Sequence, residues 1–352
     1  MTEAVLVTGA GGVGKTTVSA AIGVSLARAG LRTLVLTVDP ARRLASALGL
    51  GDELGSEPFP HPDEPNLWAA MLDSTQSWRS VAIRHADPDV AARLVNNEFF
   101  LAASQHFPAS QSYAAADQAA TFVEAGAWDV VVVDTPPSAG GIDFFTAPAD
   151  MADLVGGRLL RWLTGGPLPG RRFFYRTAAK PVLRIADSVL GSNLLERVAE
   201  FLLDLRTTYD GVADRGRQIE ALLSRAKTLV VTTADPAPIT EAARFYRDLP
   251  EVGSVPAAVI FNRSLPQEWI GFEPPDDTDT KLVENLARWA SESLRQSDAR
   301  AEFGAVHKAV VATIPWVAEP PTDLDGLAGL LAETEELTAR SLKLEPKRKM
   351  GA

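Results

Sequence analysis

The chain has 352 residues, of which 46% are hydrophobic and 22% charged, and its formal net charge is −11. This length and apolar content are enough for one large or two ordinary domains with a substantial core. The acidic balance argues against non-specific nucleic-acid binding, which depends on a basic surface. The absence of cysteine excludes disulfides, structural zinc held by thiolates, iron–sulfur ligation and a cysteine nucleophile.

No run of 18 uninterrupted apolar residues occurs, and the first residues predict a strand rather than a signal peptide. We therefore expect a cytoplasmic protein.

The first predicted strand, residues 5–7, leads into the segment 9–17, which satisfies the pattern GxxxxGK[ST] of a phosphate-binding loop. Its glycines leave room for main-chain N–H groups to close around phosphate oxygens, and the helical stretch 16–29 that follows favours an anion at its N-terminus. Lys15 can reach the β- and γ-phosphates, and the Thr16 hydroxyl can ligate Mg²⁺. The sequence therefore predicts a site for ATP and Mg²⁺, formed by Gly11, Gly12, Val13, Gly14, Lys15, Thr16 and Thr17.

Three glycines of the same loop also spell GxGxxG, and Asp39 ends the next predicted strand, where a dinucleotide fold places its ribose-binding acid. Lys15 and Thr16 favour the triphosphate interpretation, because a dinucleotide fingerprint needs neither residue directly after its last glycine. A dinucleotide-dependent oxidoreductase stays open as an alternative.

Six short apolar runs rich in β-branched residues predict strands, most of them separated by long helical stretches. Continuous rather than alternating hydrophobicity is typical of strands covered on both faces, so we expect an α/β protein with a mainly parallel sheet flanked by helices. The polar segments that follow these strands should converge on one site, because ligands bind beyond the carboxyl ends of parallel strands. The runs are 5–7, 34–38, 130–133, 229–231, 257–261 and 309–314.

Two aspartates at predicted strand ends are candidates for the chemistry. Asp134 ends an apolar run in the form of a second acidic motif that would hold Mg²⁺, directly or through a water. Asp39 could orient an attacking water opposite the γ-phosphate. Taken alone, Asp134 could equally cap a strand, and Asp39 could equally form a turn before Pro40.

Four segments together resemble the ATPase family of arsenite pumps and tail-anchored-protein targeting factors. They are the phosphate loop and residues 39–44, 134–138 and 314–316. The resemblance covers nearly the whole chain in order, and it is closest to the bacterial branch. It implies a dimeric ATPase of the deviant P-loop class, with Lys15 and Asp39 as catalytic residues and Asp134 opening the second switch. It also implies that Asn262 reads the adenine and that the loop after Pro315 covers it.

Three departures limit what the resemblance implies. The family normally has a lysine at the position of Ala10, which reaches the nucleotide of the partner subunit. Without it, the partner is either a second copy or a paralogue that keeps the lysine. The cysteines that bind arsenite in the pump, or zinc in the eukaryotic targeting factors, are absent. We therefore expect neither metalloid transport nor a zinc-locked dimer.

A long stretch, residues 150–225, predicts helices without strands, with apolar residues at helical spacing in 182–190 and 194–205. We expect these helices to pack on the sheet or on each other, or to present an apolar face to a client's hydrophobic helix or a partner, as the resemblance implies. A basic and aromatic segment, 158–176, is a loop or a peripheral membrane contact.

We divide the chain into a nucleotide-binding core of 1–149 and 226–342, which includes a helical stretch of about 74–122, a helical subdomain of 150–225, and a basic tail of 343–352. The predicted function is an ATPase whose nucleotide-driven dimer rearrangement moves the helical subdomain to handle a hydrophobic protein or an envelope-related client. A low-activity nucleotide-binding subunit that pairs with a lysine-bearing paralogue is the alternative.

Overall fold

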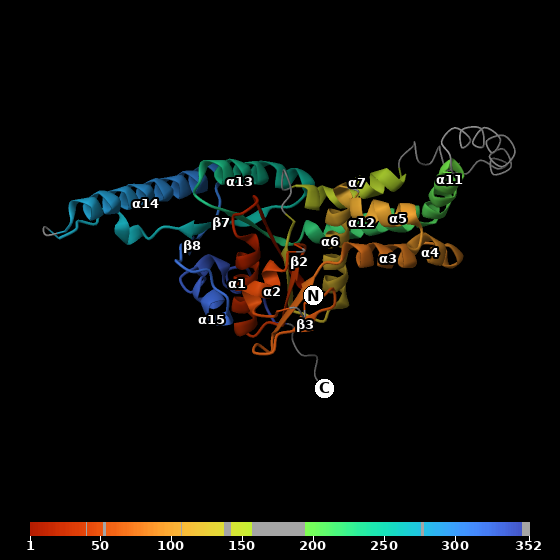
Figure 1. The fold of residues 1–352 in the computed structure, drawn as a ribbon, viewed down its shortest axis with the longest axis horizontal. Coiled ribbons are helices and arrows are strands. Elements are labelled where there is room, and N and C mark those ends of the chain that lie inside the picture. The colour runs from red at the N-terminus through yellow and green to blue at the C-terminus, as the bar shows by residue number, and fades with distance from the viewer. Residues whose placement is uncertain are drawn as a thin grey trace. The chain divides into compact units, whose positions relative to one another are not determined.

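The computed structural model describes residues 1–39, 41–51, 54–106, 108–136, 142–156, 194–275 and 278–346. These residues form two compact units, which we describe separately (Figure 1). Unit 1 comprises Met1–Leu72, Ala119–Phe144 and Leu222–Ala352, and unit 2 comprises Asp73–Gln118 and Phe145–Ala221. The predicted helix over 182–190, the segment 158–176 and residues 347–352 of the basic tail lie outside the described residues.

Unit 1 contains an eight-stranded sheet with the strand order β3-β4-β2-β5-β1-β6-β7-β8. Every neighbouring pair is parallel except β3 with β4, so the predicted mainly parallel sheet is confirmed. All six predicted runs are strands. The strands are β1 (Glu3–Gly9), β2 (Thr33–Thr37), β3 (Phe59–Pro60), β4 (Leu67–Met71), β5 (Val130–Asp134), β6 (Lys227–Thr232), β7 (Pro256–Ser264) and β8 (Val311–Pro315).

Two strands were not predicted. β4 reads Leu-Trp-Ala-Ala-Met, without a β-branched residue, and alanine is depleted in strands. It becomes a strand because it pairs in parallel with the whole of β2, from Thr33 opposite Leu67 to Thr37 opposite Met71. The two-residue β3 then pairs with β4 in the antiparallel sense.

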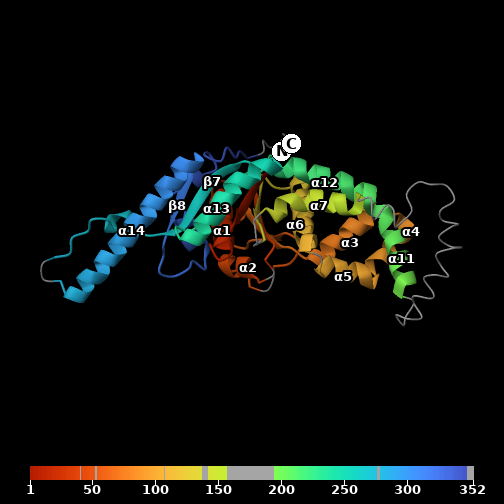
Figure 2. The ribbon, with the colours of Figure 1, turned by 90° about the horizontal axis from the view of Figure 1, so that it is seen from above.

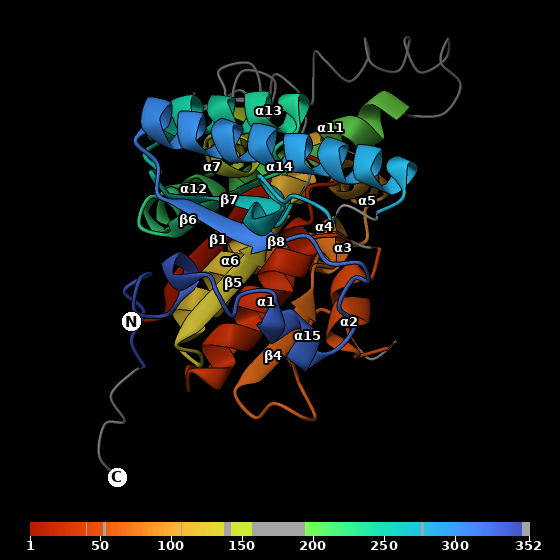
Figure 3. The same ribbon diagram turned by 90° about the vertical axis from the view of Figure 1, so that its left-hand side faces the viewer.

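Helices cover both faces of this sheet (Figure 3). On one face, apolar side chains of β1, β2, β5 and β6 pack with the fully buried Val18, Ile22 and Leu26 of α1 (Lys15–Arg28), which recur every four residues along that helix. Helices α2 (Arg43–Leu48) and α15 (Leu324–Gly329) complete that face. Helices α13 (Pro236–Asp248) and α14 (Thr280–His307) lie on the other. Short 3-10 turns are η3 (Leu249–Val252), η4 (Gln267–Trp269) and η5 (Glu335–Leu337).

Unit 2 is helical in its described residues (Figure 2). A small apolar cluster joins four of its helices; it includes Ala82, Leu94 and Phe100, and Phe201 packs against it. Its elements are α3 (Ser74–His85), α4 (Pro88–Val95), α5 (Glu98–His106), α11 (Leu194–Leu205), η2 (Arg206–Thr208), and parts of α6 (Pro108–Ala125), α7 (Asp143–Gly156) and α12 (Tyr209–Leu223).

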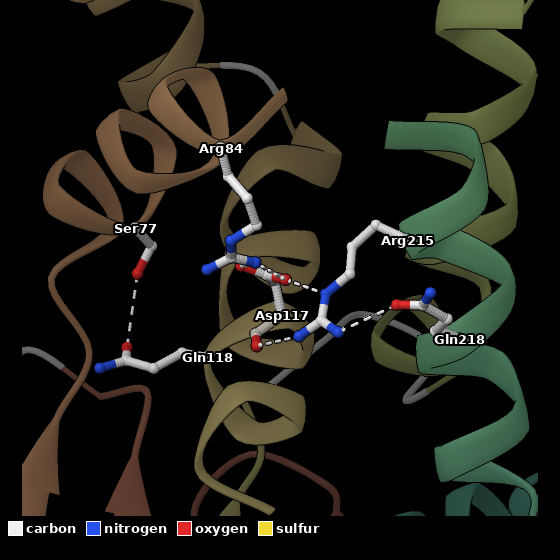
Figure 4. Close-up of polar contacts among 6 residues, drawn as sticks. All are labelled: Ser77, Arg84, Asp117, Gln118, Arg215 and Gln218. Atoms are coloured by element: carbon white, nitrogen blue, oxygen red, sulfur yellow. Dashed lines mark hydrogen bonds and ion pairs between the residues drawn. The ribbon is translucent and has the colours of Figure 1, made fainter. Parts of the chain in front are cut away.

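A buried ion pair ties three helices of unit 2 together (Figure 4). Asp117 of α6 accepts hydrogen bonds from Arg215 Nε of α12 at 2.6 Å and from Arg84 of α3 at 3.2 Å. The side chains of Asp117 and Arg215 are 3% and 5% exposed. Breaking a buried ion pair is costly, so the contacts of Asp117 favour this packing of the three helices.

The grouping of residues 73–118 with unit 2 differs from the sequence-based division, which placed about 74–122 in the nucleotide-binding core. Contacts between distant parts of the chain decide the grouping. Trp78 stacks on Tyr113 with ring centroids 5.2 Å apart, and Asp117 pairs with Arg215 almost a hundred residues later. A helical pattern shows which face of a helix is apolar, but not which helix covers it.

None of the helices in the described part of the chain combines the length and the apolar character that crossing a membrane requires.

Candidate nucleotide-binding site

The phosphate-binding loop runs from the carboxyl end of β1 to the first turn of α1. Gly9, Gly12 and Gly14 have φ values of 146°, 79° and 94°, which side-chain-bearing residues rarely adopt. A Cβ atom on Gly9 would lie 2.1 Å from the Val231 carbonyl oxygen, whereas one on Gly11 or Gly12 would meet nothing within 4 Å. The loop is therefore closely packed where it leaves the sheet and open at Gly11 and Gly12, where a phosphate could approach the main chain.

Asn262 reaches the loop from β7, as the convergence of strand ends predicted. Its Nδ2 donates to the Val13 carbonyl oxygen at 2.8 Å, and its Oδ1 accepts from the Arg263 N–H at 3.0 Å. A Cβ atom on Gly14 would lie 2.4 Å from Asn262 Nδ2, so this contact needs glycine at position 14. Asn262 thus braces the phosphate loop, and its contact with an adenine stays a prediction.

Lys15 is buried at the start of α1, with 7% of its surface exposed. Its Nζ donates to the carbonyl oxygens of Gly9 and Ala10 at 3.0 and 2.9 Å. Burial lowers the pKa of Lys15, and the nearby Asp134 carboxylate opposes that shift. An ammonium group has three donors, so these two contacts leave one for an anion at the mouth of the loop.

Asp134, the last residue of β5, lies against the loop with 2% exposure. Its Oδ2 accepts hydrogen bonds from Thr16 Oγ1 at 2.7 Å and Thr37 Oγ1 at 2.9 Å. Its Oδ1 is buried and has no hydrogen-bond partner among the described residues. Burial raises the pKa of Asp134 to about 6, although both hydroxyl groups and Lys15 favour the ionised form.

This pair of residues fits a magnesium ion. Mg²⁺ prefers oxygen ligands and usually keeps several waters, taking one or two protein ligands together with substrate phosphates. The hydroxyl of Thr16 and the unpartnered carboxylate oxygen of Asp134 supply that chemistry. Within the described ranges, no group of three or more histidine, aspartate and glutamate side chains could hold a metal by itself. Waters and nucleotide oxygens would complete the coordination of Mg²⁺ at this pair.

Asp39 follows β2 and forms a turn. Its Oδ1 accepts from the Ala41 N–H at 2.9 Å, and its Oδ2 pairs with Arg43 at 3.1 Å. Its own N–H donates to Thr37 Oγ1 at 3.2 Å. These are contacts that the turn-forming interpretation predicts, and the water-orienting role of Asp39 remains a prediction.

Pro315 ends β8, where it is exposed and lies opposite Ser264 in the register. The next residue, Trp316, donates its N–H to the Ser264 carbonyl oxygen at 2.8 Å. The loop that follows β8 therefore starts near the end of β7. Asn262 lies on that strand, two residues before Ser264. Whether this loop covers a base stays a prediction.

Thr37 belongs to the site but was not predicted. The threonine at the end of a buried strand gave no local signal of function. Only the pairing of β2 with β5 shows that Thr37 lies directly opposite Asp134.

A mainly parallel sheet with the GxxxxGK[ST] loop between β1 and α1 defines the fold of a P-loop nucleoside triphosphatase. A family model for anion-transporting ATPases matches residues 2–286, and the chain belongs to this family. The resemblance seen in the motifs is thereby confirmed.

Three relatives illustrate the match. The chain is 32% identical over 242 residues to an uncharacterized protein of Streptomyces coelicolor, covering 66% of this chain and 54% of the relative. It is 33% identical over 156 residues to a provisionally named arsenical pump-driving ATPase of Halobacterium salinarum, covering 41% and 23%. A similarly named protein of Aquifex aeolicus is 23% identical over 279 residues, covering 76% and 64%. The chain thus spans about half the length of the first relative and less than a quarter of the second.

Proposed function

We propose that this chain binds ATP with Mg²⁺ at the loop 9–17 and hydrolyses the β–γ phosphoanhydride bond. The observation that carries the proposal is the carboxylate of Asp134, buried against the loop with one oxygen on Thr16 and the other unpartnered. A buried carboxylate with one unpartnered oxygen is costly unless a cation meets that oxygen when the protein works. Family membership supports the nucleotide, and the residues of the loop support its phosphates.

Each residue of the site has a separate role in this proposal. The open main chain at Gly11 and Gly12 would donate N–H groups to phosphate oxygens, and the remaining donor of Lys15 would meet the β- and γ-phosphates. Thr16 and Asp134 would hold Mg²⁺, which neutralises charge on those phosphates. Asp39 would accept a hydrogen bond from the attacking water and orient it.

Two substitutions test this assignment. Lys15→Ala should remove most ATP affinity in calorimetry, because the phosphates lose the cation inside the loop, whereas Lys281→Ala, on the exposed start of α14, should leave it unchanged. Asp39→Asn should keep ATP bound but slow turnover, because an amide orients water less well and takes up no proton. Unchanged ATP binding by Lys15→Ala would refute the site.

We further propose that the chain works as a dimer whose nucleotide-dependent rearrangement moves the helices of unit 2, in order to handle a hydrophobic protein or an envelope-related client. Support comes from membership of the family and from the helical composition of unit 2. Membership of a family of ATPases argues against a dinucleotide-dependent oxidoreductase.

A second candidate, a low-activity subunit that pairs with a lysine-bearing paralogue, is favoured by Ala10. This residue is 5% exposed and packs in the core cluster of unit 1, so the loop carries an apolar side chain where a bridging lysine is expected. Turnover by the isolated chain that is linear in enzyme concentration would count against an obligate partner. Ala10→Lys should raise that turnover only if two copies face each other.

A further inference from the structure

A chain of hydrogen bonds connects the two acids of the site through Thr37. The backbone N–H of Asp39 donates to Thr37 Oγ1 at 3.2 Å, and Thr37 Oγ1 donates to Asp134 Oδ2 at 2.9 Å. Thr37 is fully buried at the last position of β2, and its register partner on β5 is Asp134 itself. The hydroxyl therefore lies between two strand ends that carry different parts of the predicted chemistry.

The direction of these bonds follows from the chemistry of the groups. A hydroxyl has one proton and two lone pairs, and an ionised carboxylate only accepts. The Thr37 proton is therefore used on Asp134, which leaves a lone pair of the same oxygen for the N–H of Asp39. Hydrogen bonds in series polarise one another, so each contact strengthens the other.

The other hydrogen bond to the same oxygen of Asp134 comes from Thr16, which lies in the phosphate loop. The Thr16 hydroxyl is the group expected to turn toward a metal when nucleotide is present. The Thr37 hydroxyl comes from the sheet instead, and its strand neighbours hold it in place. Thr37 is thus the contact that would keep the Asp134 carboxylate oriented while the loop responds to nucleotide.

We propose that Thr37 is a positioning residue, which holds the Asp134 carboxylate and the backbone of Asp39 in one geometry and so couples the metal-binding acid to the water-orienting segment. This inference rests on the proposed function. It assigns Thr37 no contact with substrate.

Three variants test the proposal. Thr37→Val removes the hydroxyl and keeps the shape, and Thr37→Ser keeps the hydroxyl. Thr33→Val is the matched control, because Thr33 is also a fully buried residue of β2 but donates to the Leu31 carbonyl oxygen. Melting temperatures show whether the variants fold, and if Thr37→Val does not, Thr37→Ala compared with Thr37→Ser takes its place.

The first measurement is amide hydrogen exchange at Asp39 in the nucleotide-free protein. Loss of one hydrogen bond should speed this exchange about tenfold in Thr37→Val, and less than about twofold in Thr37→Ser and Thr33→Val. The second measurement is a Mg²⁺ titration of ATP hydrolysis. The half-saturating Mg²⁺ concentration should rise about tenfold in Thr37→Val, with a lower kcat, while ATP affinity without Mg²⁺ changes less than about twofold.

The proposal is overturned if Thr37→Val matches Thr33→Val in both measurements. It is also overturned if Thr37→Ser is as impaired as Thr37→Val, since the methyl packing and not the hydroxyl would then matter. Failure of the proposed function gives a different result. Wild-type protein would then show no Mg²⁺-dependent ATP binding, and Lys15→Ala would bind ATP no worse than wild type. In that case the coupling falls together with the proposed function, even if exchange at Asp39 responds to Thr37.

Discussion

The stability of nucleotide-free Asp134→Asn, measured relative to wild type, should increase as the pH rises. The same substitution should weaken Mg²⁺ binding. The carboxylate is 2% exposed, and burial raises its pKa from the usual value of 3.8 to about 6. A carboxyl group whose pKa is raised by folding contributes stability that is fully present below pH 3.8 and is lost as the pH rises through 6. Asparagine does not titrate in this range.

The magnitude follows from the two pKa values. A shift of about 2 pKa units corresponds to roughly 3 kcal/mol of stabilisation at low pH, where the carboxyl group is protonated. This stabilisation is lost completely only well above pH 6. About half of this stabilisation is already lost at pH 5, so between pH 5 and pH 8 the wild type should lose roughly 1–2 kcal/mol relative to Asp134→Asn. The effect of the asparagine amide on packing is the same at both pH values and cancels in this difference.

Urea unfolding of wild type and Asp134→Asn at pH 5 and pH 8, without nucleotide or Mg²⁺, measures this difference. The control is Glu319→Gln, because Glu319 is an exposed carboxylate. The stability difference between control and wild type should not depend on pH. A pH-independent difference for Asp134→Asn, or one of opposite sign, would show that burial does not dominate the energetics of this carboxylate.

Three further predictions concern the metal, the loop and unit 2. Mg²⁺ binding in the presence of ATP should weaken as the pH falls below about 6, since a protonated carboxyl at the end of β5 is a poor ligand, and titrations at pH 5 and 7.5 would show it. Gly9→Ala should cost about 3 kcal/mol or more in urea unfolding because of the 2.1 Å approach to the Val231 oxygen. Gly11→Ala should change stability by less than about 0.5 kcal/mol and instead weaken ATP binding. Arg215→Ala should cost about 3 kcal/mol, because the buried carboxylate of Asp117 loses the ion pair at 2.6 Å, whereas thermal melting of Arg247→Ala, which breaks an exposed pair, should match wild type.

Local patterns were sufficient for the central sheet and the phosphate loop. The runs at 5–7 and 130–133 are apolar at every position, short and rich in valine, which is typical of strands covered on both faces. The loop pattern specifies backbone conformations that glycine allows, such as the φ of 94° at Gly14, together with a lysine and a hydroxyl at fixed positions. These features depend on neighbouring residues, so a single sequence contains them.

What the sequence could not determine are features that depend on pairing between distant segments. Strand β4 exists because β2 offers it a partner, and residues 73–118 join unit 2 through contacts such as that of Asp117 with Arg215. In the site, the bracing of the loop by Asn262 and the link from Asp39 through Thr37 to the acid of β5 appear only once β7 and β2 are in register. Propensity and motif spacing describe one segment at a time, whereas hydrogen bonds across the sheet join residues about a hundred or more positions apart. The amino-acid sequence by itself thus predicted the kind of ligand and determined the sheet, and the tertiary structure decided which side chains contact the acids of the site.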